Sequence, residues 1–132
     1  MMGEREEIVQ HRLRRAYEAL EDAHILARED RWNPCVNRLY YACFYAVSAL
    51  LLRHNLSSYK HSGVRSLFNQ HFVKTDRIAR ALAQGYNDLF ARRQEGDYVD
   101  FVNFDGAQVK PWIEDAEQFV KAIADLINAP SS

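Results

Sequence analysis

Two arginines, an aspartate and a tyrosine gather near the end of one predicted helix. Arg92 and Arg93 lie in its last turn, and Asp97 and Tyr98 follow shortly after. Gly96 can turn the backbone back here, since glycine adopts the left-handed conformation without strain. A proton acceptor, a phenol and two guanidinium groups could then orient a ribose hydroxyl and neutralise a phosphate during RNA cleavage without a metal. The alternative is structural, because arginines in the last turn of a helix also interact with its dipole.

Arg38 is a lone cation near the start of a strongly apolar segment, residues 34–52. Apolar side chains recur there at steps of three and four, which predicts a helix in the middle of a bundle. A guanidinium buried there needs partners, because an unpaired buried charge is costly. Tyr45 follows at about 20° short of two helical turns, so both side chains could line one groove and grip a phosphate. Arg38 could equally pair with a carboxylate of another helix while the tyrosines fill the core.

The region from Arg53 to Arg93 is basic, and the region after it is acidic. It contains eight lysines and arginines against two acids, whereas residues 94–132 contain eight acids against two lysines. Clustered basic residues are typical of a cleft for phosphates or RNA, and Arg65 and His71 are the candidate substrate-binding residues here. On a straight helix these two would point about 120° apart. The alternative is that the two regions neutralise each other across the bundle.

Length and composition indicate one globular domain. The 132 residues, 48% hydrophobic and 27% charged, can bury a core without staples. No run reaches the roughly 18 apolar residues of a membrane helix, and no Cys/His spacing matches a zinc site. Cys35 and Cys43 would lie about 12 Å apart on one helix, too far for a disulfide, which fits a reducing cytosol. We therefore expect a cytoplasmic protein with no membrane partner, no metal and no cofactor.

The spacing of apolar residues predicts an all-α fold, an antiparallel up-down bundle of four to five helices. Helices are expected over about 4–28, 34–54 and 62–72, then from Thr75 or Asp76 to 96, and from Asn103 or Asp105 to 127. Asn33 is the expected N-cap before Pro34, and Asn55 and Gly96 are expected to end helices in the left-handed conformation. Residues 97–103 alternate polar and apolar but have no partner strand, so a loop is predicted. The chain is expected to be a single domain, residues 1–132, with a core of about 4–128.

Three blocks of the sequence are specific when their order and spacing are taken together. They are Asn37-Arg38-Leu39-Tyr40-Tyr41-Ala42-Cys43-Phe44-Tyr45-Ala46, His61-Ser62-Gly63-Val64-Arg65-Ser66-Leu67-Phe68 and Arg93-Gln94-Glu95-Gly96-Asp97-Tyr98. These blocks resemble the HEPN family of small prokaryotic helical proteins. The resemblance extends over roughly residues 13–127.

The resemblance implies a helical bundle that forms a homodimer, often encoded beside a minimal nucleotidyltransferase as a toxin–antitoxin pair. It also implies, for active members, a metal-independent endoribonuclease. Their motif is an Arg followed after four to six residues by a His, contributed by both subunits to a dimer cleft. In some pairs the partner adenylylates a tyrosine just after that His and silences the toxin. Other members bind nucleotides without cutting RNA.

The family motif is incomplete in this chain. Arg93 matches the motif arginine, but Asp97 and Tyr98 stand where the histidine is expected. Arg38 is followed by Tyr45 where related chains often have a histidine. By the same resemblance, Tyr98 is the candidate for adenylylation.

Two functions follow as alternatives. The first is a toxin-type metal-independent endoribonuclease of a toxin–antitoxin pair, in which Arg93 and Arg38 stabilise phosphate charge and Asp97 or Tyr98 acts on the 2′-hydroxyl. Substrate binding would then fall to the other candidates, Arg92, Tyr45, Arg65 and His71. The second is a catalytically silent nucleotide-binding or adaptor module that docks a nucleotidyltransferase, which the missing histidine and the net charge of −1 favour. A third, structural reading makes the cluster an ion-pair network that seals the dimer.

Overall fold

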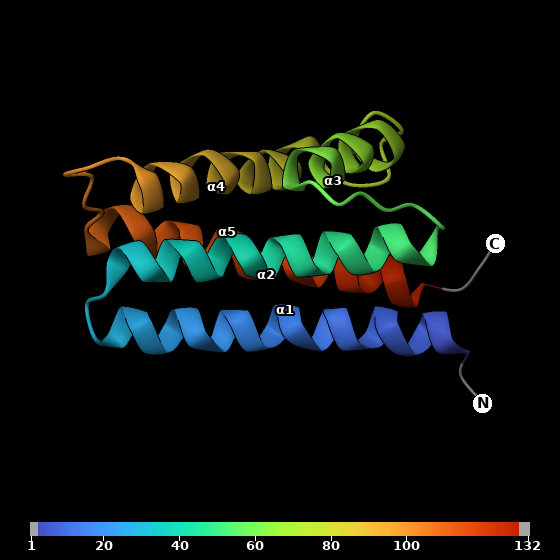
Figure 1. The fold of residues 1–132 in the computed structure, drawn as a ribbon, viewed down its shortest axis with the longest axis horizontal. Coiled ribbons are helices and arrows are strands. Elements are labelled where there is room, and N and C mark those ends of the chain that lie inside the picture. The colour runs from blue at the N-terminus through green and yellow to red at the C-terminus, as the bar shows by residue number, and fades with distance from the viewer. Residues whose placement is uncertain (1–2, 130–132) are drawn as a thin grey trace.

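Five α-helices make up the protein in a computed structural model that describes residues 3–129 (Figure 1). They are α1 (Glu4–Arg28), α2 (Trp32–Arg53), α3 (His61–Phe68), α4 (Arg80–Tyr98) and α5 (Gly106–Asn128), and a short π-helical segment, η1 (Asn69–Val73), extends α3. Consecutive long helices run in opposite directions, so the start of α1 and the end of α5 lie at the same end of the bundle. Residues 3–129 contain no strand, and the predicted all-α antiparallel bundle is confirmed.

The helix α2 is the centre of the bundle. It packs against α1, α3, α4 and α5, and Figure 1 shows it running between α1 and α4. By length and apolar composition α2 could also cross a membrane, but 61% of its most apolar window is buried inside the bundle. Such burial is typical of a core helix, whose apolar surface is covered by neighbouring helices.

Aromatic rings fill the core between α2, α3, α4 and α5. The ring of Tyr40 stacks on that of Tyr86 at 6.2 Å, and Tyr86 stacks on Phe119 at 5.4 Å. Phe68 meets Phe119 edge-on at 5.7 Å. These contacts hold Tyr40 in one position, because packed aromatic rings leave little room for rotation.

Two predicted helix boundaries are confirmed by their backbone geometry. Asn55 has a φ of 60° just after α2, and asparagine tolerates this left-handed conformation better than most residues. Asp105 is the N-cap of α5: its side chain accepts from the backbone N–H of Gln108, and the Gln108 side chain accepts from the backbone N–H of Asp105. This reciprocal capping box satisfies two backbone donors that the helix start would otherwise leave free.

The prediction that Gly96 ends the fourth helix is wrong. α4 continues through Gly96 to Tyr98, and Val99 then takes an extended conformation. Gly96 instead permits a close approach, since a Cβ there would lie 2.9 Å from the ring of Phe104. The extra turn keeps Asp97 and Tyr98 on the helix, so their directions follow from the helical period and not from a turned-back loop.

Two predicted helix starts are also wrong. α2 begins at Trp32, and the Asn33 side chain makes no cap. It donates to the carbonyls of Gly96 and Val102 and accepts from the Phe104 amide, which ties the α4–α5 loop to α2. α4 begins only at Arg80, because Asp76 has a φ of 59°, a left-handed turn conformation that interrupts the helix.

Candidate functional site

The candidate site is built around Arg93, which projects from α4 onto aromatic rings of α2. Its guanidinium carbon lies 4.8 Å from the ring centre of Tyr40 and 5.6 Å from that of Tyr41. The ring of Tyr98, further along α4, is 5.9 Å away. Arg93 is 8% exposed, and no other charged residue among the described ones is as buried. Its Nε lacks a hydrogen-bond partner within residues 3–129, so the guanidinium keeps unused donor capacity.

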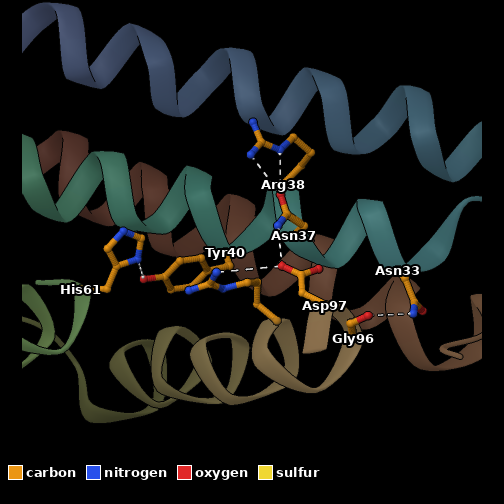
Figure 2. Close-up of polar contacts among 8 residues, drawn as sticks. Asn33, Asn37, Arg38, Tyr40, His61, Gly96 and Asp97 are labelled. Atoms are coloured by element: carbon orange, nitrogen blue, oxygen red, sulfur yellow. Dashed lines mark hydrogen bonds and ion pairs between the residues drawn. The ribbon is translucent and has the colours of Figure 1, made fainter. Parts of the chain in front are cut away.

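Asp97 lies one helical turn beyond Arg93 and faces it. Its Oδ2 is 3.9 Å from Arg93 Nη1, which is an i,i+4 ion pair along one helix face. The same oxygen accepts a hydrogen bond from Asn37 Nδ2 over 2.8 Å, and Asn37 Oδ1 accepts from Nε and Nη2 of Arg38 over 3.1 and 3.0 Å. Figure 2 shows this chain of polar contacts crossing from α4 to α2. The structure thus joins Arg38, Asp97 and Arg93 through a residue that the sequence analysis did not single out, Asn37.

An open pocket of about 570 Å³ lies beside this polar chain. Its walls come from the end of α1, the start of α2 and the end of α4. The lining residues are Leu26, Asn33, Pro34, Asn37, Arg38, Gly96 and Asp97. The pocket therefore presents a guanidinium, two amides and a carboxylate next to a small apolar wall.

A histidine contacts Tyr40, the aromatic ring on which the Arg93 guanidinium packs. The Tyr40 hydroxyl lies 2.8 Å from Nδ1 of His61, the first residue of α3 (Figure 2), and the His61 ring stacks on Phe44 at 4.1 Å. Burial, and secondly the charge of Arg93, lower the pKa of His61. The ring is therefore neutral at pH 7, and its Nδ1 can accept the bond that the Tyr40 hydroxyl donates. Burial also raises the pKa of Tyr40, which keeps this hydroxyl protonated.

The remaining basic candidates lie apart from this cluster. Arg92 follows the other face of α4, where its guanidinium carbon stands 4.0 Å from the Trp112 ring of α5 and Nη2 lies 3.9 Å from Asp88. Arg65, on α3, places its guanidinium carbon 4.0 Å above the ring of Phe90. Adjacent helical residues point about 100° apart, so Arg92 and Arg93 cannot both face α2.

Tyr45 and His71 make their polar contacts away from Arg93 and Asp97. The Tyr45 hydroxyl accepts a hydrogen bond from Arg15 Nη2 over 3.0 Å, where α2 meets α1. His71 belongs to η1, where its carbonyl accepts a bond from the Thr75 hydroxyl over 2.7 Å. The structure therefore gathers four of the eight candidates, Arg38, Arg93, Asp97 and Tyr98. Tyr45 reaches them only through Tyr41, whose ring centre is 5.8 Å away, and Arg92, Arg65 and His71 make their contacts elsewhere.

Three members of the site were missed from the sequence: Asn37, Tyr40 and His61. All three lie inside the blocks that carry the family resemblance, and that was the available signal. Their partners, however, are supplied by other helices. Local spacing therefore contains no information that would have placed Asn37 against Asp97 or His61 against Tyr40.

The chemistry of the arrangement follows from its charges. The Arg93 guanidinium pairs with the Asp97 carboxylate, and the Arg38 guanidinium is linked to that carboxylate through Asn37. Two cations, one carboxylate and a neutral imidazole favour an anion. The carboxylate can accept a proton from a bound hydroxyl. Across residues 3–129, no three His, Cys, Asp or Glu side chains gather as a metal site would require. The expected homodimer, the nucleotidyltransferase partner and the modification of Tyr98 stay predictions.

Comparison with known proteins finds relatives along nearly the whole chain. The family model described as "HEPN domain" matches residues 9–126. A "UPF0332 protein" of Thermotoga maritima is 48% identical over 126 residues, which are 96% of this chain and 96% of that protein. Two proteins of Methanocaldococcus jannaschii are similar as well. "Putative toxin MJ0605" is 34% identical over 80% of this chain and 72% of its own length, and "Putative toxin MJ0142" is 35% identical over 65% and 58%.

The HEPN model spans well over half of the sequence, and the all-α bundle agrees with the fold that the resemblance implied. The chain belongs to the HEPN family.

Proposed function

We propose that this chain is a toxin-type endoribonuclease that cuts RNA without a metal. The reaction takes place at Arg93 and the residues joined to it, Asp97, Asn37 and Arg38, which we call the Arg93 cluster. The observation that carries the proposal is the state of Arg93. It is nine-tenths buried, its Nε has no partner within residues 3–129, and its one carboxylate contact is long, at 3.9 Å. A buried guanidinium with spare donors is suited to bind a phosphate, which accepts several charge-assisted hydrogen bonds at once. Two relatives whose names contain the word toxin support the same assignment.

In the proposed reaction the 2′-oxygen of a ribose attacks the adjacent phosphorus, and the bond from phosphorus to the 5′-oxygen of the next nucleotide breaks. Arg93 and Arg38 hold the negative charge that develops on the phosphoryl oxygens. The proton of the 2′-hydroxyl passes to Asp97. Asn37 and Arg93 engage Oδ2 of that carboxylate, so Oδ1 is free for this proton. The departing 5′-oxygen takes a proton from water, which leaves a 2′,3′-cyclic phosphate and a 5′-hydroxyl.

The remaining groups position this machinery. The Tyr40 ring supports the Arg93 guanidinium, and His61 holds the Tyr40 hydroxyl. Tyr98 is 73% exposed and lies beside Arg93, so its ring can close over a bound nucleotide. An adenylyl group on Tyr98 would add a phosphate next to Arg93 and occupy the place of the substrate, which accounts for silencing by a nucleotidyltransferase.

The test is cleavage of a single-stranded RNA by the purified protein in excess chelator. Arg93→Ala is expected to lower the rate by roughly 100- to 1,000-fold, the usual cost of one donor to a developing oxyanion. Arg80→Ala, an exposed arginine at the start of the same helix, is the matched control and should cut like wild type. Wild-type protein that leaves RNA intact, or Arg93→Ala that cuts normally, would overturn the proposal.

One observation favours a second candidate, a catalytically silent nucleotide-binding module. The pocket beside Arg38 has a volume of about 570 Å³, within the usual range of roughly 300–1,000 Å³ for small-ligand sites. Arg38 and Asn37 can bind a phosphate and a ribose there. Calorimetric titration with ATP should then give binding that Arg38→Ala abolishes, together with no RNA cleavage. Absence of any heat of binding would rule this candidate out.

A further inference from the structure

One stripe of the central helix is left partly open. At steps of three and four along α2, the side chains of Arg38, Tyr41, Tyr45 and Ser48 are half-buried, whereas most of the residues between them are fully buried. We call these four residues the outer stripe. The other helices cover the rest of α2, and no described segment, within residues 3–129, covers the outer stripe completely. It begins beside the Arg93 cluster and follows the side of α2 that meets α1, where Arg15 of α1 donates a hydrogen bond to Tyr45.

Guanidinium groups flank the two tyrosine rings of the outer stripe. The guanidinium carbon of Arg15, on α1, lies 4.8 Å from the ring centre of Tyr45. Tyr45 is 5.8 Å from Tyr41, and Tyr41 is approached by Arg38 at 4.9 Å and by Arg93 at 5.6 Å. The result is an unbroken ladder of cations and aromatic rings that passes from α4 over α2 to α1.

The cations of this ladder are poorly balanced by acids. Arg15 and Arg38 make no ion pair with any described carboxylate, and Arg93 has only the long contact with Asp97. Arg12 reaches the far end of the outer stripe, where its Nη1 donates to the Ser48 carbonyl. An open surface with several unpaired guanidinium groups favours an anionic occupant.

We propose that the outer stripe with Arg15 is a track for a single-stranded RNA that leads to the Arg93 cluster, an inference that rests on the proposed ribonuclease function. Bases stack on Tyr41 and Tyr45, and phosphates bind Arg15 and Arg38. From residue 38 to residue 45 the helix advances about 10 Å, and the ring centres of Tyr41 and Tyr45 lie 5.8 Å apart, so successive bases of an extended strand can each reach one ring. Ring faces require splayed bases, so the track selects single strands over duplex.

A second copy of this chain fits the surface less well. A two-fold contact would place the outer stripe against itself. It would bring together the arginines of both copies, of which Arg15 and Arg38 have no carboxylate partner among the described residues. RNA supplies that negative charge and also supplies flat bases for the two tyrosine rings.

The test is the affinity for a fluorescently labelled, 2′-O-methylated single strand, which lacks the attacking hydroxyl and is not cut. Arg15→Ala should weaken binding and lower the slope of log affinity against log salt by about one. Tyr45→Leu should weaken it by roughly 5- to 100-fold, as loss of one stacked base does. Arg14→Ala is the matched control, an exposed neighbour on α1 that removes the same charge. It should stay within about twofold of wild type.

Equal losses in the Arg14 and Arg15 variants would show general electrostatic attraction and overturn the track. So would equal affinity for a duplex of the same length, or a molar mass by light scattering that changes in Arg15→Ala, since the stripe would then be a contact between copies. Circular dichroism checks that Tyr45→Leu is folded. If it is not, the Arg15→Ala variant still tests the track, because Arg15 is exposed and its replacement does not disturb the core. Wild-type protein that binds through the track but leaves unmodified RNA uncut refutes the ribonuclease and keeps the track. If Arg15→Ala cuts RNA with an unchanged KM, the track is refuted and the ribonuclease is kept.

Discussion

Asn37 Nδ2 donates a 2.8 Å hydrogen bond to Asp97 Oδ2, and this bond joins two residues that are 60 positions apart in the chain. It fixes one carboxylate oxygen towards α2 and leaves the other one open. Since the same amide also accepts two bonds from Arg38, Asn37 sets the relative positions of the proton acceptor and one of the two cations in the site.

Asn37→Ala should therefore slow RNA cleavage mainly through kcat, with a smaller effect on KM. The carboxylate loses its orientation, and a displacement of about 1 Å in a catalytic group can cost on the order of 100-fold in rate. The measurement is kcat and KM on single-stranded RNA. The control is Asn103→Ala, in the exposed α4–α5 loop, which should match wild type. A large rise in KM with unchanged kcat would place Asn37 in binding instead.

Removing two buried hydroxyls should have different effects on stability. Tyr40→Phe leaves His61 Nδ1 without its partner at 2.8 Å, so the free energy of unfolding should fall by about 0.5–1.5 kcal/mol. Tyr86→Phe removes a buried hydroxyl that has no partner among the described residues and should leave stability equal or higher. Urea unfolding of both variants measures the difference, and equal losses would contradict the role of the Tyr40–His61 bond.

The pH dependence of stability should contain a contribution from His61. Burial and the charge of Arg93 lower its pKa in the folded state, so below about pH 6.5 the unfolded chain binds more protons at this residue than the folded chain. Its contribution is therefore complete above about pH 6.5 and is lost as the pH falls through the lowered folded pKa.

Urea unfolding at pH 7.5 and 5.5 tests this prediction. His61→Asn should lose less stability on acidification than wild type. The pKa of His54 is also lowered, by burial and then by Arg77 and Arg53. His54→Asn should therefore also reduce the loss of unfolding free energy between pH 7.5 and 5.5, independently of His61. A pH dependence that is identical in wild type and His61→Asn would refute the assignment.

Arg93→Met should separate stability from activity. Methionine keeps contacts with the aromatic rings and removes a buried guanidinium whose Nε has no partner in the described chain. The free energy of unfolding should stay within about 1 kcal/mol of wild type or rise, because apolar residues often replace buried charges without loss. Cleavage should fall by roughly 100- to 1,000-fold, as expected for Arg93→Ala. A thermal melt and an RNA assay on one preparation measure both, and a loss above about 2 kcal/mol would make Arg93 a structural residue.

Two glycines of α4 should respond in opposite ways to alanine. At Gly96 a Cβ would lie 2.9 Å from the Phe104 ring, whereas at Gly85 the nearest atom, Asp115 Cβ, is 3.9 Å away. Gly96→Ala should cost about 1–3 kcal/mol through overpacking, and Gly85→Ala should add up to about 1 kcal/mol through helix propensity. Chemical denaturation compares them, and a stabilised Gly96→Ala would show that Phe104 moves freely.

The helices, and the features that depend on neighbours in the chain, were determined by the sequence itself. The spacing of apolar residues predicted the observed bounds of α1. Asn55 marked the end of α2, and Asp105 marked the start of α5. Arg93 and Asp97 face each other because residues four apart share a helix face, although the helix was predicted to end at Gly96, before Asp97. The three blocks of family resemblance added the fold and the region of the site.

Only the tertiary structure decided which side chains complete that site. Asn33 carries a strong capping signal, yet its side chain bonds to the Gly96 carbonyl in α4 and to the Val102 carbonyl and Phe104 backbone N–H in the α4–α5 loop. His61 reaches Tyr40 across helices, and Arg93 faces α2 while Arg92 faces α5. Helical periodicity states how far neighbouring side chains diverge. Which of them meets a partner depends on how the helices are rotated against one another, and that rotation is set by packing of the whole core.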